Sequence, residues 1–95
     1  MNKKKHRICA SKIRIIGEEN RLRIILELMK GPKNVGELEK KLNIEQSLLS
    51  HHLKALRDED LVKTSRSGRF ITYELIRRKS NEVLDLGGCE IRFKF

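Results

Sequence analysis

Aromatic residues are scarce in this sequence of 95 residues, which contains three phenylalanines, one tyrosine and no tryptophan. Proteins that recognise single-stranded nucleic acids normally stack bases on aromatic side chains. The four aromatic residues here all fall in segments whose alternating pattern predicts packed strands: Phe70, Tyr73, Phe93 and Phe95. The composition therefore argues against recognition of single-stranded RNA, although the net charge would permit it.

Long apolar runs are also lacking, and cysteine is rare. No segment approaches the roughly 18 apolar residues that a membrane-spanning helix needs, and Lys12 and Arg14 interrupt the best stretch near the start. We expect neither a membrane span nor a secretory signal. Cys9 and Cys89 alone do not resemble the dense disulfide framework of small secreted proteins. A cytoplasmic protein with no membrane partner is expected.

The signatures of common active sites are missing as well. The sequence shows no nucleophile paired with a base, no phosphate-binding glycine loop and no paired carboxylates. We therefore expect a protein that is not an enzyme and that carries no cofactor.

Positive charge, in contrast, is abundant and unevenly distributed. The 22 Lys and Arg exceed the 13 Asp and Glu, which gives a net charge of +9. Residues 1–23 carry eight basic and two acidic side chains, and residues 63–79 carry six and one. Such basicity favours polyanionic partners, either nucleic acid or an anionic membrane surface, and does not by itself choose between them.

The central part of the chain predicts three helices. Asn20 precedes a helix over residues 21–30, whose apolar side chains recur at the spacing of one helix face. Gly31-Pro32 ends that helix. Asn34 is a good N-cap for a second helix of about two turns.

The third predicted helix follows a tight connector at residues 43–45 and runs from Gln46 to about Glu59. Its inward stripe consists of Leu49, Leu53 and Leu56. Two helices joined by a short turn form a helix-turn-helix, here over about residues 34–59.

A basic hairpin is predicted directly after this motif. Residues 61–65 and 70–75 alternate between apolar and polar side chains, and Arg66-Ser67-Gly68-Arg69 has the composition of a turn. A hairpin in this place, over about residues 61–75, is a wing. The predicted fold class is thus mainly α with a small β-hairpin wing, a winged helix-turn-helix.

The ends of the chain are less regular. A mobile tail is expected over residues 1–5, and residues 8–16 fit either a helix, which we favour, or a strand. Residues 80–86 predict a helix, and the alternation in residues 89–95 predicts a short terminal strand. This length fits a single domain, 1–95, with a marginal core that a second copy would help to stabilise, so we expect a homodimer.

The second helix of a helix-turn-helix inserts its N-terminal part into the major groove of DNA. The side chains expected to reach base edges there are Gln46, Ser47, Ser50 and His51, and Lys54 and Arg57 share that helix face. On the wing, contacts with phosphates or a minor groove are expected from Lys63, Arg66 and Arg69. The acidic run 58–60 is expected at the far end of the helix, away from the phosphates.

Residues 17–75 resemble the ArsR/SmtB family of bacterial and archaeal repressors. The segments that carry the resemblance are GEENRLRIILEL, NVGELEKKLNIEQSLLSHHLKALRDEDLV and the wing segment GRFITYEL. The resemblance implies a homodimer built from the N- and C-terminal segments, a double-stranded DNA operator as partner, and release from it when an inducer binds. We therefore expect a sequence-specific transcriptional regulator, by family habit a repressor, whose inducer is unknown.

The metal ligands typical of that family have no counterpart here. Its Cys-x-Cys pair corresponds to Asn34-Val35-Gly36, and residues 80–95 contain Glu82, Asp85 and Glu90 but no histidine. A zinc site would lack its usual thiolate and imidazole ligands, so no metal site is expected. His52 is interpreted as a packing or phosphate-contacting residue, because His51 and His52 are adjacent and face different directions on a helix.

Cys9 and Cys89 leave two interpretations open. Free cysteines are commonly small buried hydrophobes, and we favour this interpretation. If the terminal segments meet in the dimer, the two residues could instead form a thiol sensor within or across subunits. The alternative function is a winged-helix module that senses nothing and binds nucleic acid or protein, with structural cysteines; the acidic run 58–60 is the main support for a protein-binding version.

Overall fold

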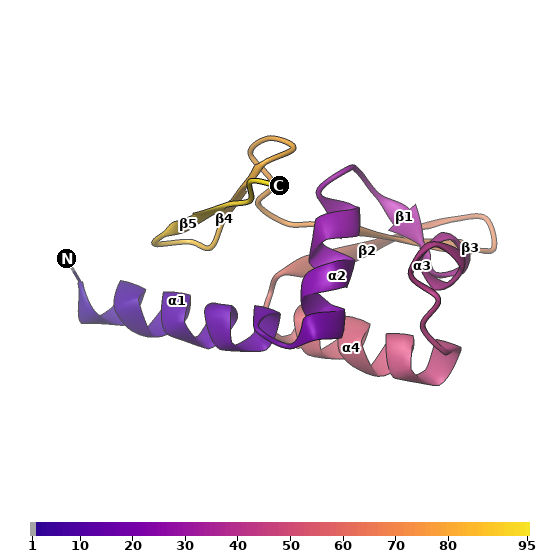
Figure 1. Ribbon diagram of the computed structural model, residues 1–95, viewed down its shortest axis with the longest axis horizontal. Coiled ribbons are helices and arrows are strands. Elements are labelled where there is room, and N and C mark those ends of the chain that lie inside the picture. Colours follow the sequence, from indigo (N-terminus) through magenta and orange to yellow (C-terminus); the bar gives the residue numbers. More distant parts are fainter. Residues whose placement is uncertain (1) are drawn as a thin grey trace.

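The computed structural model describes residues 2–95, an elongated molecule that measures 43 Å along its longest axis (Figure 1). The helices are α1 (Lys3–Ile16), α2 (Glu19–Leu28), α3 (Val35–Leu42) and α4 (Gln46–Asp58). The strands are β1 (Lys33–Asn34), β2 (Val62–Ser67), β3 (Phe70–Leu75), β4 (Val83–Asp85) and β5 (Glu90–Arg92). The predicted helix-turn-helix and wing are both present, which confirms the winged-helix fold class.

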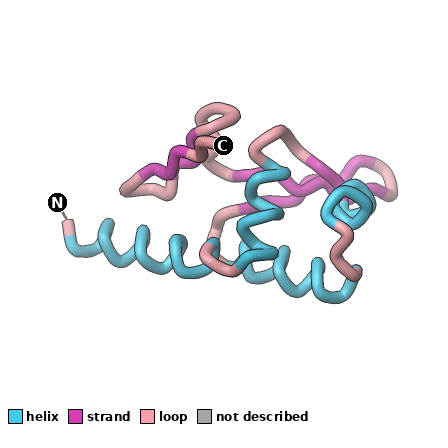
Figure 2. Tube along the Cα trace, in the orientation of Figure 1, coloured by secondary structure: helices cyan, strands magenta, loops and turns pink. Residues whose placement is uncertain are grey.

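The strands form two separate antiparallel sheets. In the first, β3 lies between β1 and β2, and the wing register runs from Val62 opposite Leu75 to Ser67 opposite Phe70. The second is the hairpin of β4 and β5. Figure 2 shows α1 and α4 along the lower side of the molecule and the strands along the upper side, with this terminal hairpin over α1. The C-terminal hairpin thereby lies beside the N-terminal helix.

Caps at both ends of α3 define the helix-turn-helix. Asn34 forms a capping box, because its side chain accepts a hydrogen bond from the Glu37 N–H while the Glu37 carboxylate accepts one from the Asn34 N–H. Asn43 ends the helix in the left-handed conformation, at φ 53°. The N-cap predicted at Asn34 is confirmed. After Asn43 the chain turns, and α4 begins at Gln46.

One core holds the helices, the wing and the terminal hairpin together. Its fully buried residues come from α2, α3, α4, β2 and the hairpin: Ile24, Ile25, Leu28, Leu38, Leu49, Leu53, Leu56, Val62, Leu84 and Leu86. Each buried aliphatic side chain contributes about 1.5–3 kcal/mol relative to exposure. The hairpin is therefore part of the core and not an appendage.

The N-terminal segment is more ordered than expected. Residues 8–16 are helical as favoured, but α1 already begins at Lys3, with the Asn2 side chain as its cap. The expected tail over residues 1–5 is therefore wrong for residues 3–5, whereas Met1 lies outside the described residues. The Asn2 side chain accepts a hydrogen bond from the Lys4 N–H, which would otherwise have no partner at the start of the helix, and so limits fraying of that end.

Residues 80–86 are not helical, which corrects the expected C-terminal helix. The Ser80 hydroxyl accepts hydrogen bonds from the backbone N–H groups of Glu82 and Val83, which makes a turn and leads into β4. Leu84 then pairs with Ile91 of β5. Strand β5 follows shortly after residues 80–86 in the chain and pairs with them as an antiparallel hairpin. This pairing overrides the helical tendency of residues 80–86, which form only a very short segment.

Candidate nucleic-acid interface

The polar face of α4 lies at one end of the molecule together with the wing. Figure 1 shows the start of α4 and the turn between β2 and β3 at the same end, opposite the N-terminus. The exposed residues of this helix include every one of its side chains that is predicted to contact DNA: Gln46, Ser47, Ser50, His51, Lys54 and Arg57. The opposite face is buried through Leu49, His52, Leu53 and Leu56. The helix therefore presents one polar face to solvent.

Glu45 caps the start of α4 and engages one of the predicted base contacts. Its carboxylate accepts hydrogen bonds from the Ser47 hydroxyl, at 2.6 Å, and from the N–H groups of Ser47 and Leu48. These bonds, the hydroxyl first, lower the pKa of Glu45. The hydroxyl of Ser47 is thus occupied by the cap in the free protein.

Gln46, Ser50 and His51 differ from Ser47 in this respect. In residues 2–95, no side-chain hydrogen bond or ion pair engages any of the three. Each projects from the first two turns of α4, the part of a recognition helix that enters the major groove. They are the better candidates for contacts with base edges.

Further along α4, positive charge is partly compensated. Lys54 Nζ lies 2.7 Å from Asp58 Oδ2, one helical turn away, and the hydrogen bond from Lys54 lowers the pKa of the Asp58 carboxyl. Glu59 accepts a hydrogen bond from the Ser11 hydroxyl of α1. Within the acidic run, Glu59 therefore serves the contact between α1 and the end of α4, at the opposite end of the helix from the wing tip.

The wing presents two arginines at its tip. Gly68, at φ 61°, occupies a left-handed conformation in the turn between β2 and β3, and this tight turn leaves Arg66 and Arg69 exposed. Lys63 is also exposed, but its Nζ lies 3.7 Å from Glu74 Oε1 on the neighbouring strand. Within the described chain neither arginine has an ion-pair partner, so their charges are available to a polyanion.

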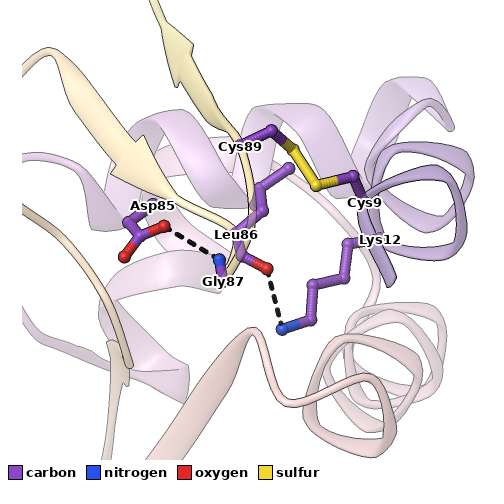
Figure 3. The surroundings of a disulfide bond; sticks show 6 residues. All are labelled: Cys9, Lys12, Asp85, Leu86, Gly87 and Cys89. Carbon is purple, nitrogen blue, oxygen red and sulfur yellow. Dashed lines mark hydrogen bonds between the residues drawn. A yellow bond between two sulfur atoms is a disulfide. The ribbon is translucent and has the colours of Figure 1, made fainter. Parts of the chain in front are cut away.

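A disulfide bond joins Cys9 of α1 to Cys89 at the terminal hairpin, 80 residues away (Figure 3). Beside it, Lys12 Nζ donates a hydrogen bond to the Leu86 carbonyl at 3.3 Å. A Cβ on Gly88 would meet Lys5 Cβ at 3.0 Å, so the hairpin approaches α1 closely. The favoured interpretation of two unlinked buried cysteines is therefore wrong. Of the two arrangements left open, within or across subunits, the structure shows the one within a single chain.

Sequence analysis missed two residues that contact α4, Glu18 and Arg21 at the start of α2. Both contact the ring of His52, which is buried, as its packing interpretation predicts. Arg21 and His52 are 31 residues apart in the chain, so no local pattern indicated this contact. Among residues 2–95, no group of three or more His, Cys, Asp or Glu side chains is arranged to hold a metal ion.

A recognition helix with an exposed polar face, next to a basic two-stranded wing, defines the class of winged-helix DNA-binding regulators. The family model of bacterial regulatory proteins of the arsR type matches residues 18–64. The chain belongs to this ArsR family. Within the described residues, no helix is long and apolar enough to cross a membrane.

Several similar proteins are transcriptional regulators. The chain is 37% identical to the HTH-type transcriptional regulator NmtR of Mycobacterium tuberculosis over 76 residues, which are 80% of this chain and 63% of that protein. It is 32% identical to the transcriptional activator HlyU of Vibrio cholerae, with 78% of this chain and 68% of that one covered. The chain thus spans about two thirds of the length of these curated relatives.

Among solved structures, the transcriptional repressor BigR of Xylella fastidiosa aligns with a TM-score of 0.75 at 32% identity, covering 83% of this chain and 81% of that one. HlyU of Vibrio cholerae aligns with a TM-score of 0.73 at 33% identity, covering 79% and 80%. Both an activator and a repressor therefore share this fold and this level of identity.

Proposed function

We propose that this ArsR-family regulator binds a double-stranded DNA operator as a homodimer and represses transcription in the cytoplasm until an inducer releases it, as one domain over residues 1–95. The observation that supports this most is the exposed polar start of α4 beside the unpaired arginines of the wing. The dimer would be built from the N- and C-terminal segments. No catalytic role or cofactor is proposed.

In this proposal the DNA-contacting residues fall into two groups. Gln46, Ser50 and His51 contact base edges and give sequence preference, with Ser47 available once Glu45 releases it. Charge attraction comes from residues on α4 and the wing: Lys54, Arg57, Lys63, Arg66 and Arg69. A twofold dimer would recognise half-sites about one helical turn of DNA apart, or a multiple of that distance.

This division of labour predicts different outcomes for two alanine substitutions. Ser50→Ala should lower the preference for operator over shuffled DNA by about two- to tenfold, the loss expected for one hydrogen bond. Arg69→Ala should lower affinity for both duplexes by the same factor, because a phosphate contact carries no sequence information. Fluorescence anisotropy with the chain's own upstream DNA and a shuffled duplex measures both.

Arg14→Ala is the matched control, since it removes the same charge from an exposed position on α1. It should leave both affinities close to those of the unchanged protein. Because α1 belongs to the proposed dimer interface, sedimentation checks that this variant keeps the oligomeric state of the unchanged protein. If Ser50→Ala lowers affinity equally for both duplexes, the assignment of base contacts to α4 is wrong. If Arg14→Ala lowers affinity as much as Arg69→Ala, only net charge matters. If the unchanged protein binds no DNA at low salt, the protein-interaction alternative is favoured.

We further propose that Cys9 and Cys89 form a thiol switch. In oxidation the two thiols lose two electrons and two protons as the S–S bond forms; a hydroperoxide accepts them and yields water and an alcohol, or a persulfide yields a thiol and hydrogen sulfide. The bond ties α1 to the terminal hairpin, the two segments proposed to form the dimer. Its formation would therefore change the relative position of the two α4 helices.

The switch predicts that operator affinity differs between the reduced and the oxidised protein by about 5- to 150-fold, the usual range of allosteric coupling. Anisotropy titrations before and after treatment with peroxide or persulfide measure the ratio. Cys9→Ser and Cys89→Ser should each abolish the response. Equal affinity in both states would leave the disulfide with a structural role only.

A further inference from the structure

His52 is a buried residue on the same helix that carries the proposed base contacts. Only 5% of its surface is exposed, whereas His51 next to it is exposed, and the centroids of the two rings lie 5.5 Å apart. The His52 Nδ1 atom accepts a hydrogen bond from Arg21 Nε at 3.1 Å. The His52 Nε2 atom lies 3.2 Å from Glu18 Oε2. Both ring nitrogens thus contact the start of α2.

The direction of these bonds fixes the state of the imidazole ring. Arginine can only donate, so the Nδ1 atom that accepts from Arg21 carries no proton. The neutral ring then has its proton on Nε2, from which it donates to the Glu18 carboxylate. Arg21, His52 and Glu18 therefore form a chain in which each donor meets an acceptor.

Glu18 links this chain to the backbone of α2. It is the N-cap of α2 and accepts hydrogen bonds from the N–H groups of Asn20 and Arg21. The same carboxylate thus fixes the first turn of α2 and restrains a side chain of α4. Elsewhere α4 is buried through leucines, whose contacts are not directional, so the two polar contacts of His52 add a specific orientation.

We propose that His52 is a positioning residue for DNA recognition, which holds α4 against the start of α2 through Glu18 and Arg21 and so aims the proposed base contacts at the groove. The inference rests on the proposed function of α4 as the recognition helix. Ser50 and His51 directly precede His52, so a rotation of α4 that its loss permits would displace their side chains from the base edges.

Protonation of His52 would break one of its two contacts. With a proton on Nδ1, His52 can no longer accept the hydrogen bond from Arg21, and two cations, the imidazolium ring and the guanidinium group, then face each other. The contact of Nε2 with Glu18 persists. The charged and titratable groups that face the ring are Glu18 and Arg21 at the start of α2 and His51 on α4. The pKa of His52 is lowered, chiefly by burial; Glu18 opposes that shift, and Arg21 and His51 add to it.

The sign of the pH effect follows from this lowered pKa. The unfolded chain binds the proton more readily than the folded one, so the His52 arrangement stabilises the protein fully above a pH of about 6.5. That stabilisation is lost as the pH falls through the pKa of the folded state. Discrimination between operator and other DNA should decrease in the same acidic range.

The test compares three variants at pH 7.5 and 5.5 by anisotropy, with the chain's own upstream duplex and a shuffled duplex as probes. His52→Leu fills the buried site without polar contacts and should lower the operator preference by about two- to tenfold, the loss expected for one hydrogen bond. His52→Gln keeps a donor and an acceptor but no titratable group, so it should restore the preference and remove its decrease in acid. His6→Leu makes the same change at an exposed position on α1, away from the contacts of His52. It should leave the operator preference and its decrease in acid unchanged, and sedimentation checks that this variant keeps the oligomeric state of the unchanged protein.

Arg21→Leu gives a second route should His52→Leu fail to fold, which circular dichroism would show. It removes the donor to Nδ1 from a half-buried position and should lower the operator preference in the same way. The inference is overturned if the folded His52→Leu or Arg21→Leu variants discriminate as well as the unchanged protein, or if His52→Gln restores nothing. An unchanged protein that shows no preference for its own upstream DNA would overturn the proposed function, and this inference with it.

Discussion

Reduction of the Cys9–Cys89 disulfide is expected to lower the free energy of unfolding by about 4.5 kcal/mol. The bond closes a loop with a sequence separation of 80 residues, and a cross-link of this span restricts the unfolded chain over nearly all of its length. The chain-entropy model gives about 3 kcal/mol for a loop of 15 residues and about 4.7 kcal/mol for 100. A domain of this size has only about 5–15 kcal/mol in total.

Urea unfolding of the oxidised and the reduced protein, at one fixed protein concentration, measures this difference. A double variant, Cys9→Ser with Cys89→Ser, is the control, because it should match the reduced protein and ignore the reductant. A difference below about 1 kcal/mol would contradict the prediction. It would mean that Leu84 and Leu86, which are fully buried, anchor the hairpin to the core so firmly that the covalent bond adds little.

The helix-turn-helix and the wing could be predicted because their signals are local. Asn34 and Glu37 are three residues apart and cap the same helix, and Asn43 takes the left-handed conformation that a short turn requires. Leu49, Leu53 and Leu56 repeat on one helix face and are all buried. In such segments the residues that form the sequence pattern are the same residues that cap the helix or pack in the core.

The terminal hairpin could not be predicted in full, because its structure depends on distant partners. Residues 89–95 alternate and predict a strand, but the stretch before them is too short to distinguish a helix from a strand by periodicity. Leu84 and Leu86 are buried by packing against the core, and this packing selects the extended form. The predicted terminal strand was correct, although it spans only Glu90–Arg92.

The contacts that connect distant segments were the least predictable. The sequence indicated that the two cysteines could meet within or across subunits, yet only the fold brings Cys9 of α1 to Cys89 within one chain. The contact of His52 with Glu18 and Arg21 likewise joins segments that no local pattern relates. Burial of His52 was predictable from its position beside the leucine stripe, but its partners were not.

The affinity for operator DNA is expected to fall at least about a thousandfold between 50 and 200 mM salt. In a dimer, Lys63, Arg66 and Arg69 of the two wings alone make about six phosphate contacts, and each releases nearly one counterion from the DNA. The slope of log affinity against log salt is therefore expected to be about −5 or steeper, since Lys54 and Arg57 of α4 add to it. Anisotropy titrations at four or more salt concentrations measure it.

The three wing residues should not contribute equally to that slope. Lys63 already has a counter-charge, since its Nζ lies 3.7 Å from Glu74 Oε1, whereas Arg66 and Arg69 have no ion-pair partner among residues 2–95. Substitution of either arginine by alanine removes one contact from each protomer and should make the slope about two units shallower, whereas Lys63→Ala should change it less. Arg14→Ala on α1 is again the control. A slope that stays the same in the arginine variants would exclude the wing from the DNA contacts and leave α4 as the source of affinity.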